Sequence, residues 1–349
     1  MRTLQLIIAI LLFPLTIWYS VGVAVRNMLY RSGLKKSIPS VIPTIGIGNL
    51  RMGGTGKTPH TEYLVRLFSD RRTALLSRGY GRKTKGFLIA GKDADSKAHE
   101  AELLGDEPAM MAHKFPDLTV AVCEDRVHGI QCLAHQPEPP ELVLLDDVYQ
   151  HRHIRPTLTI LLTEYRDLFS DDHILPFGNL REFRSGCRRA DIVVVTKCPP
   201  SLSKPKRDEY RRKLRLGSRQ HLFFSHIDYQ PPRSLLDDNE WHPVKEILLV
   251  TGIAHPDPLK RHLERQSTVT HLAYPDHHAF STADCHRIAA RFRSLKESSK
   301  AVVTTEKDAM RLLSAPAREQ LKELPIFYIP IQVSFTEGDT FDRTIKKYV

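Results

Sequence analysis

The stretch "NLRMGGTGKTPH", residues 49–60, decides how the rest of the chain is interpreted. It has the glycines, lysine and threonine of a phosphate-binding loop, although Arg51 stands where the G-x-x-x-x-G-K-[ST] pattern has its first glycine. The run "VIPTIGIGN" before it is typical of a strand, and "PHTEYLVRLFSD" after it is typical of a helix with Pro59 in its first turn. A loop in this context presents backbone N–H groups to phosphate oxygens, so we favour a phosphate loop over a plain glycine turn.

Seven residues of this loop are predicted to contact a nucleotide: Met52, Gly53, Gly54, Thr55, Gly56, Lys57 and Thr58. Lys57 is expected to reach the β- and γ-phosphates, and Thr58 to place its hydroxyl on Mg²⁺. Gly53 and Gly54 can supply the flexibility that the missing first glycine usually gives.

A second motif supports this interpretation. The apolar run "LVLLDD" ends in Asp146 and Asp147. Enzymes with a phosphate loop keep a magnesium-associated carboxylate at the end of such a strand. An ordinary strand exit is the alternative, and the neighbouring phosphate loop makes it the weaker one.

Short apolar runs recur along the first two thirds of the chain, separated by helix-length or turn-rich segments: "TALLSRG", "LTVAVCED", "ELVLLDD", "LTILLTE" and "DIVVVTK". Near-continuous apolar strands are typical of a parallel sheet that is covered on both faces. The pattern predicts an α/β protein with a doubly wound, mostly parallel sheet of the P-loop NTPase type.

A second set of strand and helix patterns follows a proline- and charge-rich stretch at 204–243: "EILLVTGIAHPDPLKRHL", "KAVVTTEKDAMRLL" and "PIFYIPIQVSF". We therefore predict three parts. Residues 1–30 form a membrane-associated helix, 31–230 the phosphate-loop domain and 231–349 a smaller α/β domain.

The bulk composition narrows the partners. The formal charge of +11 and pI near 9.4 favour nucleic acid, anionic lipid or a phosphorylated substrate. The positive charge is dispersed and no aromatic-basic platform is visible, so nucleic acid is the weakest of these. The five cysteines are scattered without a CxxC pair, which argues against a disulfide framework and for a reducing cytosol.

The amino terminus is uncharged and apolar from Leu4 to Val25, about the ~20 residues that cross a bilayer. Trp18 and Tyr19 are aromatics of the kind found at membrane interfaces. Basic residues follow at Arg26, Arg31, Lys35 and Lys36. We favour a helix seated in the membrane, spanning it or lying in the interface, over a cleaved signal peptide or a buried core helix.

Two further motifs are ambiguous alone. "GDEP", residues 105–108, precedes a helix-like run, where capping carboxylates are common. "PDHHAF" and "HRH" (His151, His153) could together bind a metal, but the chain has 17 histidines and chance clusters are expected. We do not predict a zinc site.

Taken together, the motifs resemble those of the tetraacyldisaccharide 4′-kinases, the lipid A 4′-kinases of Gram-negative bacteria. They run through the chain in order: "GNLRMGGTGKTP", "SRGYGR", "GDEP", "DDVYQH", "LPFGNLRE", "VVVTK", "TGIAHP", "PDHHAF" and "TTEKDA". That family also carries a non-glycine residue where Arg51 stands. One departure is Val148 and Tyr149, where the family usually reads Gly-Leu.

The resemblance implies ATP-dependent phosphorylation of the 4′-hydroxyl of a tetraacyldisaccharide 1-phosphate, a step of lipid A biosynthesis, with ATP and Mg²⁺ as cofactors. The implied partners are the lipid disaccharide and the bacterial inner membrane, at its cytoplasmic face. No nucleic acid and no obligate protein partner are expected.

Family roles carry over by position. Asp106 in "GDEP" matches the general base, with His277 in "PDHHAF" as its partner and Lys57 as the third catalytic residue. Because the two members of the pair lie in different predicted domains, they would meet when the domains approach. The remaining family positions surround the metal, at Thr58, Asp146, Asp147 and Glu182, and the phosphates or nucleotide, at Arg78, Tyr80 and Arg181.

Two functions from other classes remain. A membrane-associated P-loop GTPase acting as a metallochaperone or assembly factor would explain the phosphate loop and the histidines. However, "TKCP" lacks the aspartate that guanine recognition usually needs two residues after the lysine. A membrane scaffold with a vestigial nucleotide site is the third alternative, and the intact Lys57 and Thr58 argue against it.

Overall fold

The computed structural model describes residues 2–91, 100–236, 239–276, 278–313 and 321–349. The chain forms two compact units, Met1–Ile227 together with Val333–Val349, and Asp228–Gln332. This differs from the expected division at the C-terminus, because residues 333–349 return to the first unit. The physical reason is α11 (Gly338–Lys346), whose Phe341 and Ile345 are buried in that unit's core.

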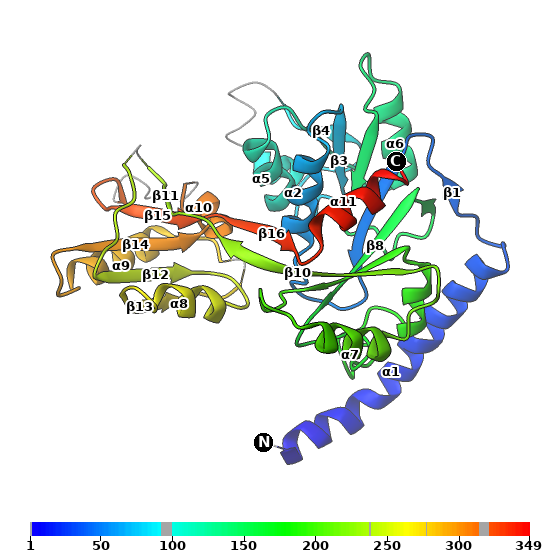
Figure 1. Ribbon diagram of the computed structural model, residues 1–349, viewed down its shortest axis with the longest axis horizontal. Helices are drawn as coiled ribbons and strands as arrows, with labels where there is room; N and C mark the ends of the chain where they lie inside the picture. Colours follow the sequence, from blue (N-terminus) through cyan, green and yellow to red (C-terminus); the bar gives the residue numbers. More distant parts are fainter. Residues whose placement is uncertain (1, 92–99, 237–238, 277, 314–320) are drawn as a thin grey trace. The chain divides into compact units, whose positions relative to one another are not determined.

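The first unit is built on a nine-stranded sheet in the order β16-β10-β9-β8-β2-β6-β3-β5-β4 (Figure 1). Neighbours from β10 to β5 are parallel, and β4 is antiparallel to β5. The strands are β2 (Thr44–Asn49), β3 (Thr73–Ser77), β4 (Leu88–Ile89), β5 (Thr119–Val122), β6 (Leu142–Leu145), β8 (Leu158–Glu164), β9 (Ile192–Thr196), β10 (His221–Tyr229) and β16 (Ile331–Phe335). The predicted α/β class with a mostly parallel sheet is confirmed.

The helices of this unit lie on both faces of the sheet. They are α1 (Arg2–Arg31), α2 (Lys57–Leu67), α4 (Glu100–Leu104), α5 (Asp106–Lys114), α6 (Arg126–Ala134), the 3₁₀ helix η1 (Arg184–Arg189), α7 (Lys204–Leu214) and α11. A two-stranded parallel sheet, β1 (Ile38–Pro39) with β7 (Ile154–Arg155), lies beside the main one.

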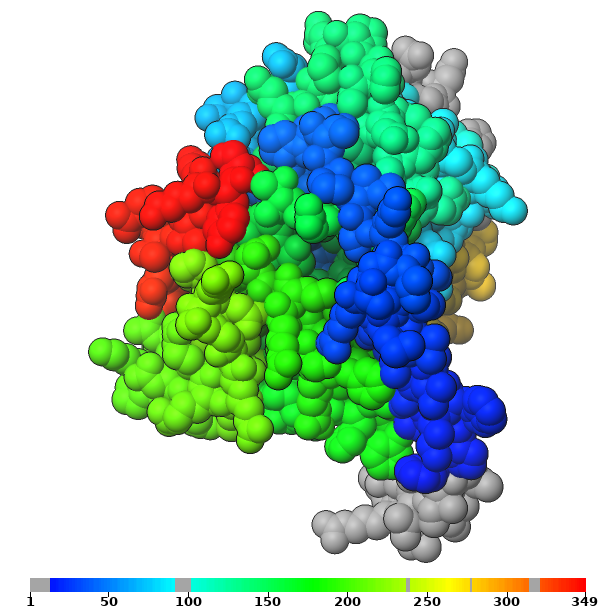
Figure 2. Space-filling model, turned by 90° about the vertical axis from the view of Figure 1, so that its right-hand side faces the viewer, coloured from blue at the N-terminus to red at the C-terminus, as the bar shows by residue number. Residues whose placement is uncertain are grey.

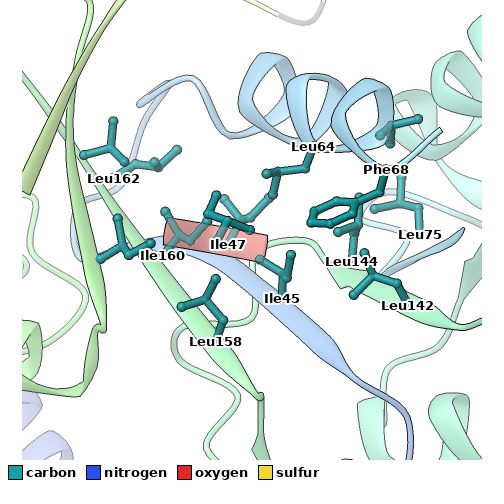
Figure 3. Close-up of a cluster of buried hydrophobic side chains, with 14 of the residues drawn as sticks. Ile45, Ile47, Leu64, Phe68, Leu75, Leu142, Leu144, Leu158, Ile160 and Leu162 are labelled. Atoms are coloured by element: carbon teal, nitrogen blue, oxygen red, sulfur yellow. The ribbon is translucent and has the colours of Figure 1, made fainter. Parts of the chain in front are cut away.

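Alternate residues of each strand face opposite layers of helices, which explains why the strands are apolar throughout. Ile45 and Ile47 of β2 pack with Leu64 of α2 and with Phe68 at its C-cap on one face (Figure 3), and α5 and α11 contribute to the same cluster. On the other face, Val143 and Leu145 of β6 pack with α6. Farther along that face, Val193 of β9 packs with α7 and η1.

Helix α1 keeps most of its described apolar side chains at the surface. Trp18 is 76% exposed and Met28 is 59% exposed, whereas Val23 is buried. The Tyr19 hydroxyl donates to the Arg181 carbonyl at 2.8 Å. Figure 2 shows α1, in blue, beside the green middle of the chain. Among the residues that the structure describes, no helix is long and apolar enough to cross a membrane.

The second unit has a five-stranded sheet in the order β11-β15-β14-β12-β13, parallel except for the β11–β15 pair. Its elements are β11 (Arg233–Ser234), β12 (Glu246–Thr251), α8 (Asp257–Leu263), β13 (Thr268–Ala273), α9 (Thr282–Arg293), β14 (Lys300–Thr305), α10 (Glu306–Leu313) and β15 (Ile326–Ile329). Helix α9 begins with a capping box between Ser281 and Asp284. Helices α9 and α10 cover one face of the sheet and α8 the other.

Candidate active site

The glycine-rich loop joins β2 to α2 at the carboxyl end of the strand, as a phosphate loop does. Gly56 is the N-cap of α2 and has a φ of 88°, a left-handed conformation that glycine adopts without strain. Gly53 also has a positive φ. The N–H groups of the first turn of α2 therefore face the loop, where the helix dipole favours an anion.

Arg51 holds the loop in place instead of forming a tight turn. It makes an isolated bridge with Leu180, and its Nε lies 2.6 Å from Asp172 Oδ2. Its Nη1 donates to the Asp167 carbonyl at 2.9 Å. The backbone φ of Arg51 is not positive, so this position does not need a glycine. The irregular motif thus reflects a loop that is anchored to the segment 167–180.

Three polar side chains support the loop, two of them at strand ends (Asn49 and Thr196) and one in α2 (His60). Asn49 Nδ2 donates to Thr55 Oγ1 at 2.9 Å, and the Thr196 hydroxyl donates to the Thr55 carbonyl at 2.9 Å. The His60 ring contacts the Gly56 carbonyl through Nδ1 at 2.7 Å and Ser225 Oγ through Nε2 at 2.9 Å. A carbonyl only accepts, so Nδ1 carries the proton. Burial lowers the pKa of His60 to about 4, which keeps the ring neutral.

The two acids at the end of β6 have different partners. Asp147 Oδ1 lies 3.6 Å from Lys57 Nζ, and Arg181 Nη1 donates to both of its oxygens at 2.9 and 3.1 Å. Burial raises the pKa of Asp147, but Lys57 and Arg181 outweigh this and hold it below its usual value. Asp147 is therefore ionised and fixed beside the loop lysine.

Asp146 points into a small cavity of about 10 Å³ that Thr58, Ser77 and Glu107 also line. Its Oδ1 is buried and has no hydrogen-bond partner among the described residues. Burial, and then the negative charge of Glu107, raise the pKa of Asp146 to about 7. Two carboxylates and a hydroxyl around one cavity are the hard oxygen ligands that Mg²⁺ takes. The unpartnered oxygen of Asp146 and the other oxygen ligands around this cavity fit the requirements of such a cation.

The "GDEP" motif lies against the "SRGYGR" motif. A Cβ at Gly105, whose φ is 94°, would come within 2.7 Å of the Tyr80 carbonyl, so only glycine fits there. Asp106 opens α5 and is exposed, whereas Glu107 turns toward Thr58 and Asp146. Tyr80 is 90% exposed.

Arg78 is exposed, and its positive charge lowers the pKa of both Arg126 and His151, although burial is the larger cause for each. Arg126 is fully buried, and its Nη2 donates to the Asp146 carbonyl at 3.2 Å. Arg78 thus lies close enough to Arg126 and His151 for its charge to be felt by both.

Glu182 lies in a different environment from the one expected of a metal ligand. It is completely buried, and Arg189 donates to its two oxygens at 2.7 and 2.9 Å. Gln150 Nε2 also donates to Glu182, at 3.2 Å. The structure therefore places this carboxylate in an ion pair, while Glu107 occupies the cavity beside Asp146.

His277 lies outside the described residues, so the predicted Asp106–His277 pair is not located. Its neighbour His278 donates from Nε2 to Asp284 at 3.0 Å and stacks on Tyr274 at 4.7 Å. These contacts belong to the second unit.

The "HRH" motif does meet an acid. Asp125, His151 and His153 have one ligand atom each within 4.8 Å of the others. Burial and the charge of Arg126 lower the pKa of His151 to about 4. The buried guanidinium of Arg126 beside this cluster opposes a further positive charge.

Comparison with known proteins decides the family. A family model described as tetraacyldisaccharide-1-P 4′-kinase matches residues 8–349. The tetraacyldisaccharide 4′-kinase of Flavobacterium johnsoniae is 44% identical over 346 residues, which cover 97% of this chain and 96% of that protein. This chain belongs to the tetraacyldisaccharide 4′-kinase family. The tetraacyldisaccharide 4′-kinase of Bacteroides fragilis is 42% identical over 352 residues, covering 97% of this chain and 92% of that protein.

A solved structure agrees. LpxK from Aquifex aeolicus, crystallised in complex with ATP, matches with a TM-score of 0.74 and 27% identity, covering 98% of this chain and 99% of that one. The predicted lipid A 4′-kinase is thereby confirmed, and these comparisons give no support to the GTPase alternative.

Sequence reasoning did not single out several residues that build the site of this family member: Asn49, His60, Glu107, Gln150 and Thr196. Asn49 and Thr196 end apolar strands, which is a signal that could have been used. His60 and Gln150 lie inside recognised motifs, where only the fold reveals their partners.

Proposed function

We propose that the chain transfers the γ-phosphoryl group of ATP to the 4′-hydroxyl of a tetraacyldisaccharide 1-phosphate at the loop between β2 and α2. The observation that carries this proposal is the cluster of Lys57, Asp147 and Arg181 beside the loop. Family membership and the ATP in the related LpxK crystal support it.

Lys57 and the backbone N–H groups of the loop bind the phosphates. Asp147 orients Lys57 through their 3.6 Å ion pair, and Arg181 shares that carboxylate. Both cations thereby lie on one side of the loop, where they can neutralise charge on the transferred group. Arg78 and Tyr80, exposed in the adjoining turn, are the remaining residues proposed to meet phosphate or nucleotide.

Thr58, Asp146 and Glu107 are the residues that would hold Mg²⁺. When bound, the ion neutralises charge on the β- and γ-phosphate oxygens. Asp146 and Glu107 bring two negative charges to one cavity, and a divalent cation removes their mutual repulsion. Glu182 acts through its contacts with Arg189 and Gln150.

Asp106 is the proposed general base. It is exposed at the start of α5, one residue before Glu107, so an incoming hydroxyl can reach it. Phosphoryl transfer depends mainly on positioning and charge, and the proton leaves late, so a carboxylate suffices. We retain His277 as the residue that orients Asp106 or shares its proton.

Helix α1 is proposed to seat the protein on the cytoplasmic face of the bacterial inner membrane. Its exposed apolar residues include Phe13, Leu15, Trp18, Val25 and Met28. A helix with such a surface and basic residues at its end lies stably in a membrane interface. The acyl chains of the acceptor would be held in the same layer.

A transfer assay tests the proposed function. The purified protein is incubated in neutral-detergent micelles with a tetraacyldisaccharide 1-phosphate and γ-labelled ATP, or GTP in a parallel sample, and the lipids are separated by thin-layer chromatography. A doubly phosphorylated lipid formed with ATP supports the proposal. Labelled phosphate released only as inorganic phosphate, or transfer that requires GTP, would contradict it.

A further inference from the structure

A pocket of about 330 Å³ in the first unit lies outside the phosphate-loop site, and arginines dominate its lining. Arg31 comes from the C-terminal end of α1, Arg152 from the segment after β6, and Arg188 and Arg189 from η1. Ser185 completes the lining. Three separate segments of the chain thus bring four guanidinium groups to one recess.

The positive charge of this arginine pocket is poorly compensated. Arg189 is paired with Glu182 and lies over the Tyr149 ring at 4.6 Å. Arg152 donates to Asn27 Oδ1 at 2.9 Å and lies over the Tyr30 ring at 4.8 Å, and both of these partners are neutral.

No carboxylate of the described chain pairs with Arg31, Arg152 or Arg188. Burial, followed by the charge of Arg189, lowers the pKa of Arg152; the charge of Glu182 opposes this shift without cancelling it. Three guanidinium groups therefore repel one another across the recess unless an anion lies between them.

The donor set suits a phosphate. Guanidinium groups present paired N–H donors that match the oxygens of a phosphate group, and a serine hydroxyl adds a further donor. Arg152 is already oriented by Asn27 and Tyr30, and Arg189 by Glu182 and Tyr149, so less side-chain entropy is lost when the anion binds.

The pocket is connected to the catalytic residues through a chain of hydrogen bonds. Glu182 accepts from Arg189 on the pocket side and from Gln150 on the other. Arg181 Nη1 donates to Gln150 Oε1 at 3.3 Å and to Asp147, which pairs with Lys57. The apolar surface of α1, with Val25 and Met28 exposed, leads up to Arg31.

We propose that the arginine pocket binds the phosphate at the 1-position of the lipid acceptor. This inference rests on the proposed function, because that acceptor carries a phosphate at the end opposite to its reacting hydroxyl. In this arrangement the acyl chains would lie along α1, the phosphate would contact Arg31, Arg152 and Arg188, and the hydroxyl would point toward Asp106. The headgroup of an anionic phospholipid offers the same phosphate chemistry, but it has no disaccharide to carry a 4′-hydroxyl toward Lys57 and Asp106.

The test compares two acceptors, the tetraacyldisaccharide 1-phosphate and the same lipid with a free 1-hydroxyl, in neutral-detergent micelles. The double variant R31Q/R188Q removes two unpaired guanidinium groups. We expect its KM for the 1-phosphate acceptor to rise on the order of tenfold or more, as for the loss of a charge-assisted hydrogen bond, with kcat little changed. Its KM for the 1-hydroxyl acceptor should stay within about twofold of wild type. The control R211Q/R212Q, which removes the same charge from the exposed face of α7, should match wild type with both acceptors.

Equal increases in KM with both acceptors, or no increase, would overturn the assignment. Flotation of each variant with phosphatidylglycerol or phosphatidylcholine vesicles tests the alternative, that the pocket binds the phosphate of a phospholipid headgroup. If R31Q/R188Q loses binding to the anionic vesicles yet keeps the wild-type preference for the 1-phosphate acceptor, the pocket takes a phospholipid headgroup and our inference fails. Binding of both labelled acceptors is also measured without ATP. A wild type that transfers no phosphate but binds the 1-phosphate acceptor more tightly would refute the proposed function and leave the pocket assignment standing.

Discussion

Asp146 and Asp147 are neighbours in the chain, yet their carboxylates lie in opposite electrostatic surroundings. Asp147 is held between Lys57 and Arg181, and its pKa is lowered. Asp146 lies in a cavity with Glu107, where burial and like charge raise its pKa to about 7. The peptide between them turns sharply, because Asp147 has a φ of 45°. Asp147 therefore holds Lys57 in place, while Asp146 faces a cavity whose oxygen ligands suit a cation.

This contrast predicts opposite pH dependences of stability. Asp146 binds its proton more tightly in the folded state, so its ionisation destabilises the ligand-free protein as pH rises from about 4 to about 7. Asp146→Asn removes that penalty. In EDTA at pH 8 we expect its melting temperature to exceed that of wild type by several degrees, and the difference should vanish near pH 4.

Asp147→Asn is the matched control, measured by the same thermal denaturation. Its folded-state pKa is lowered, so the ionised group stabilises the protein above its unfolded pKa and loses that effect in acid. The variant should be less stable than wild type at pH 8. A lower melting temperature for both variants at pH 8 would show that Asp146 is satisfied without a cation.

Arg51 predicts what happens when the usual glycine is restored. Arg51→Gly removes the ion pair with Asp172 and the hydrogen bond to the Asp167 carbonyl, at a cost of about 1–3 kcal/mol. The loop would lose its anchor without gaining a needed conformation, since φ here is not positive. We expect a lower melting temperature and a KM for ATP raised several-fold. Arg51→Lys keeps the charge, so its melting temperature and its KM for ATP should lie between those of wild type and Arg51→Gly. Tighter ATP binding by Arg51→Gly would refute the anchoring role.

Substitutions of Asp106 and Glu107 should change different kinetic parameters, because Asp106 is exposed whereas Glu107 lines the cavity beside Asp146. Asp106→Asn is expected to lower kcat by about 10²–10⁴, as loss of a general base does, with the Mg²⁺ dependence unchanged. Glu107→Gln should raise the Mg²⁺ concentration at half-maximal rate about tenfold, because the cavity loses one carboxylate. Turnover measured across a Mg²⁺ titration distinguishes them. Identical Mg²⁺ curves for wild type and Glu107→Gln would place the ion elsewhere.

The sequence allowed the layered fold to be predicted because its strands carry the pattern locally. Every residue of β2, β3 and β6 is buried, and the apolar runs in these strands predict this burial. The return of Phe341 and Ile345 to the first unit could not be predicted, since it depends on which surface a C-terminal helix covers. Linear order alone assigned residues 231–349, which include this helix, to the second domain.

Some residues of the candidate site could likewise be predicted from the sequence, and others could not. Lys57 and Asp147 follow from motifs whose spacing reflects a fixed strand–loop–helix geometry. Consecutive residues at a helix start point about 100° apart, so "GDEP" did not reveal that Glu107 rather than Asp106 faces Asp146. The arginine pocket could not be predicted from the sequence, for a different reason. Its members come from α1, the segment after β6 and η1, and no local pattern joins them.

The exposed face of α1 predicts how the protein finds its lipid acceptor. Trp18 and Met28 are exposed and apolar, whereas Val23 packs against the first unit. The double variant Trp18→Glu/Met28→Glu adds charge to the exposed face without touching that contact. Because charged side chains are costly in a membrane interface, the variant should shift toward the soluble fraction on cell fractionation, with an unchanged melting temperature. Val23→Ala, which weakens the packed face instead, should lower the melting temperature and leave membrane association intact. Wild-type membrane association of the glutamate variant would show that another surface anchors the protein.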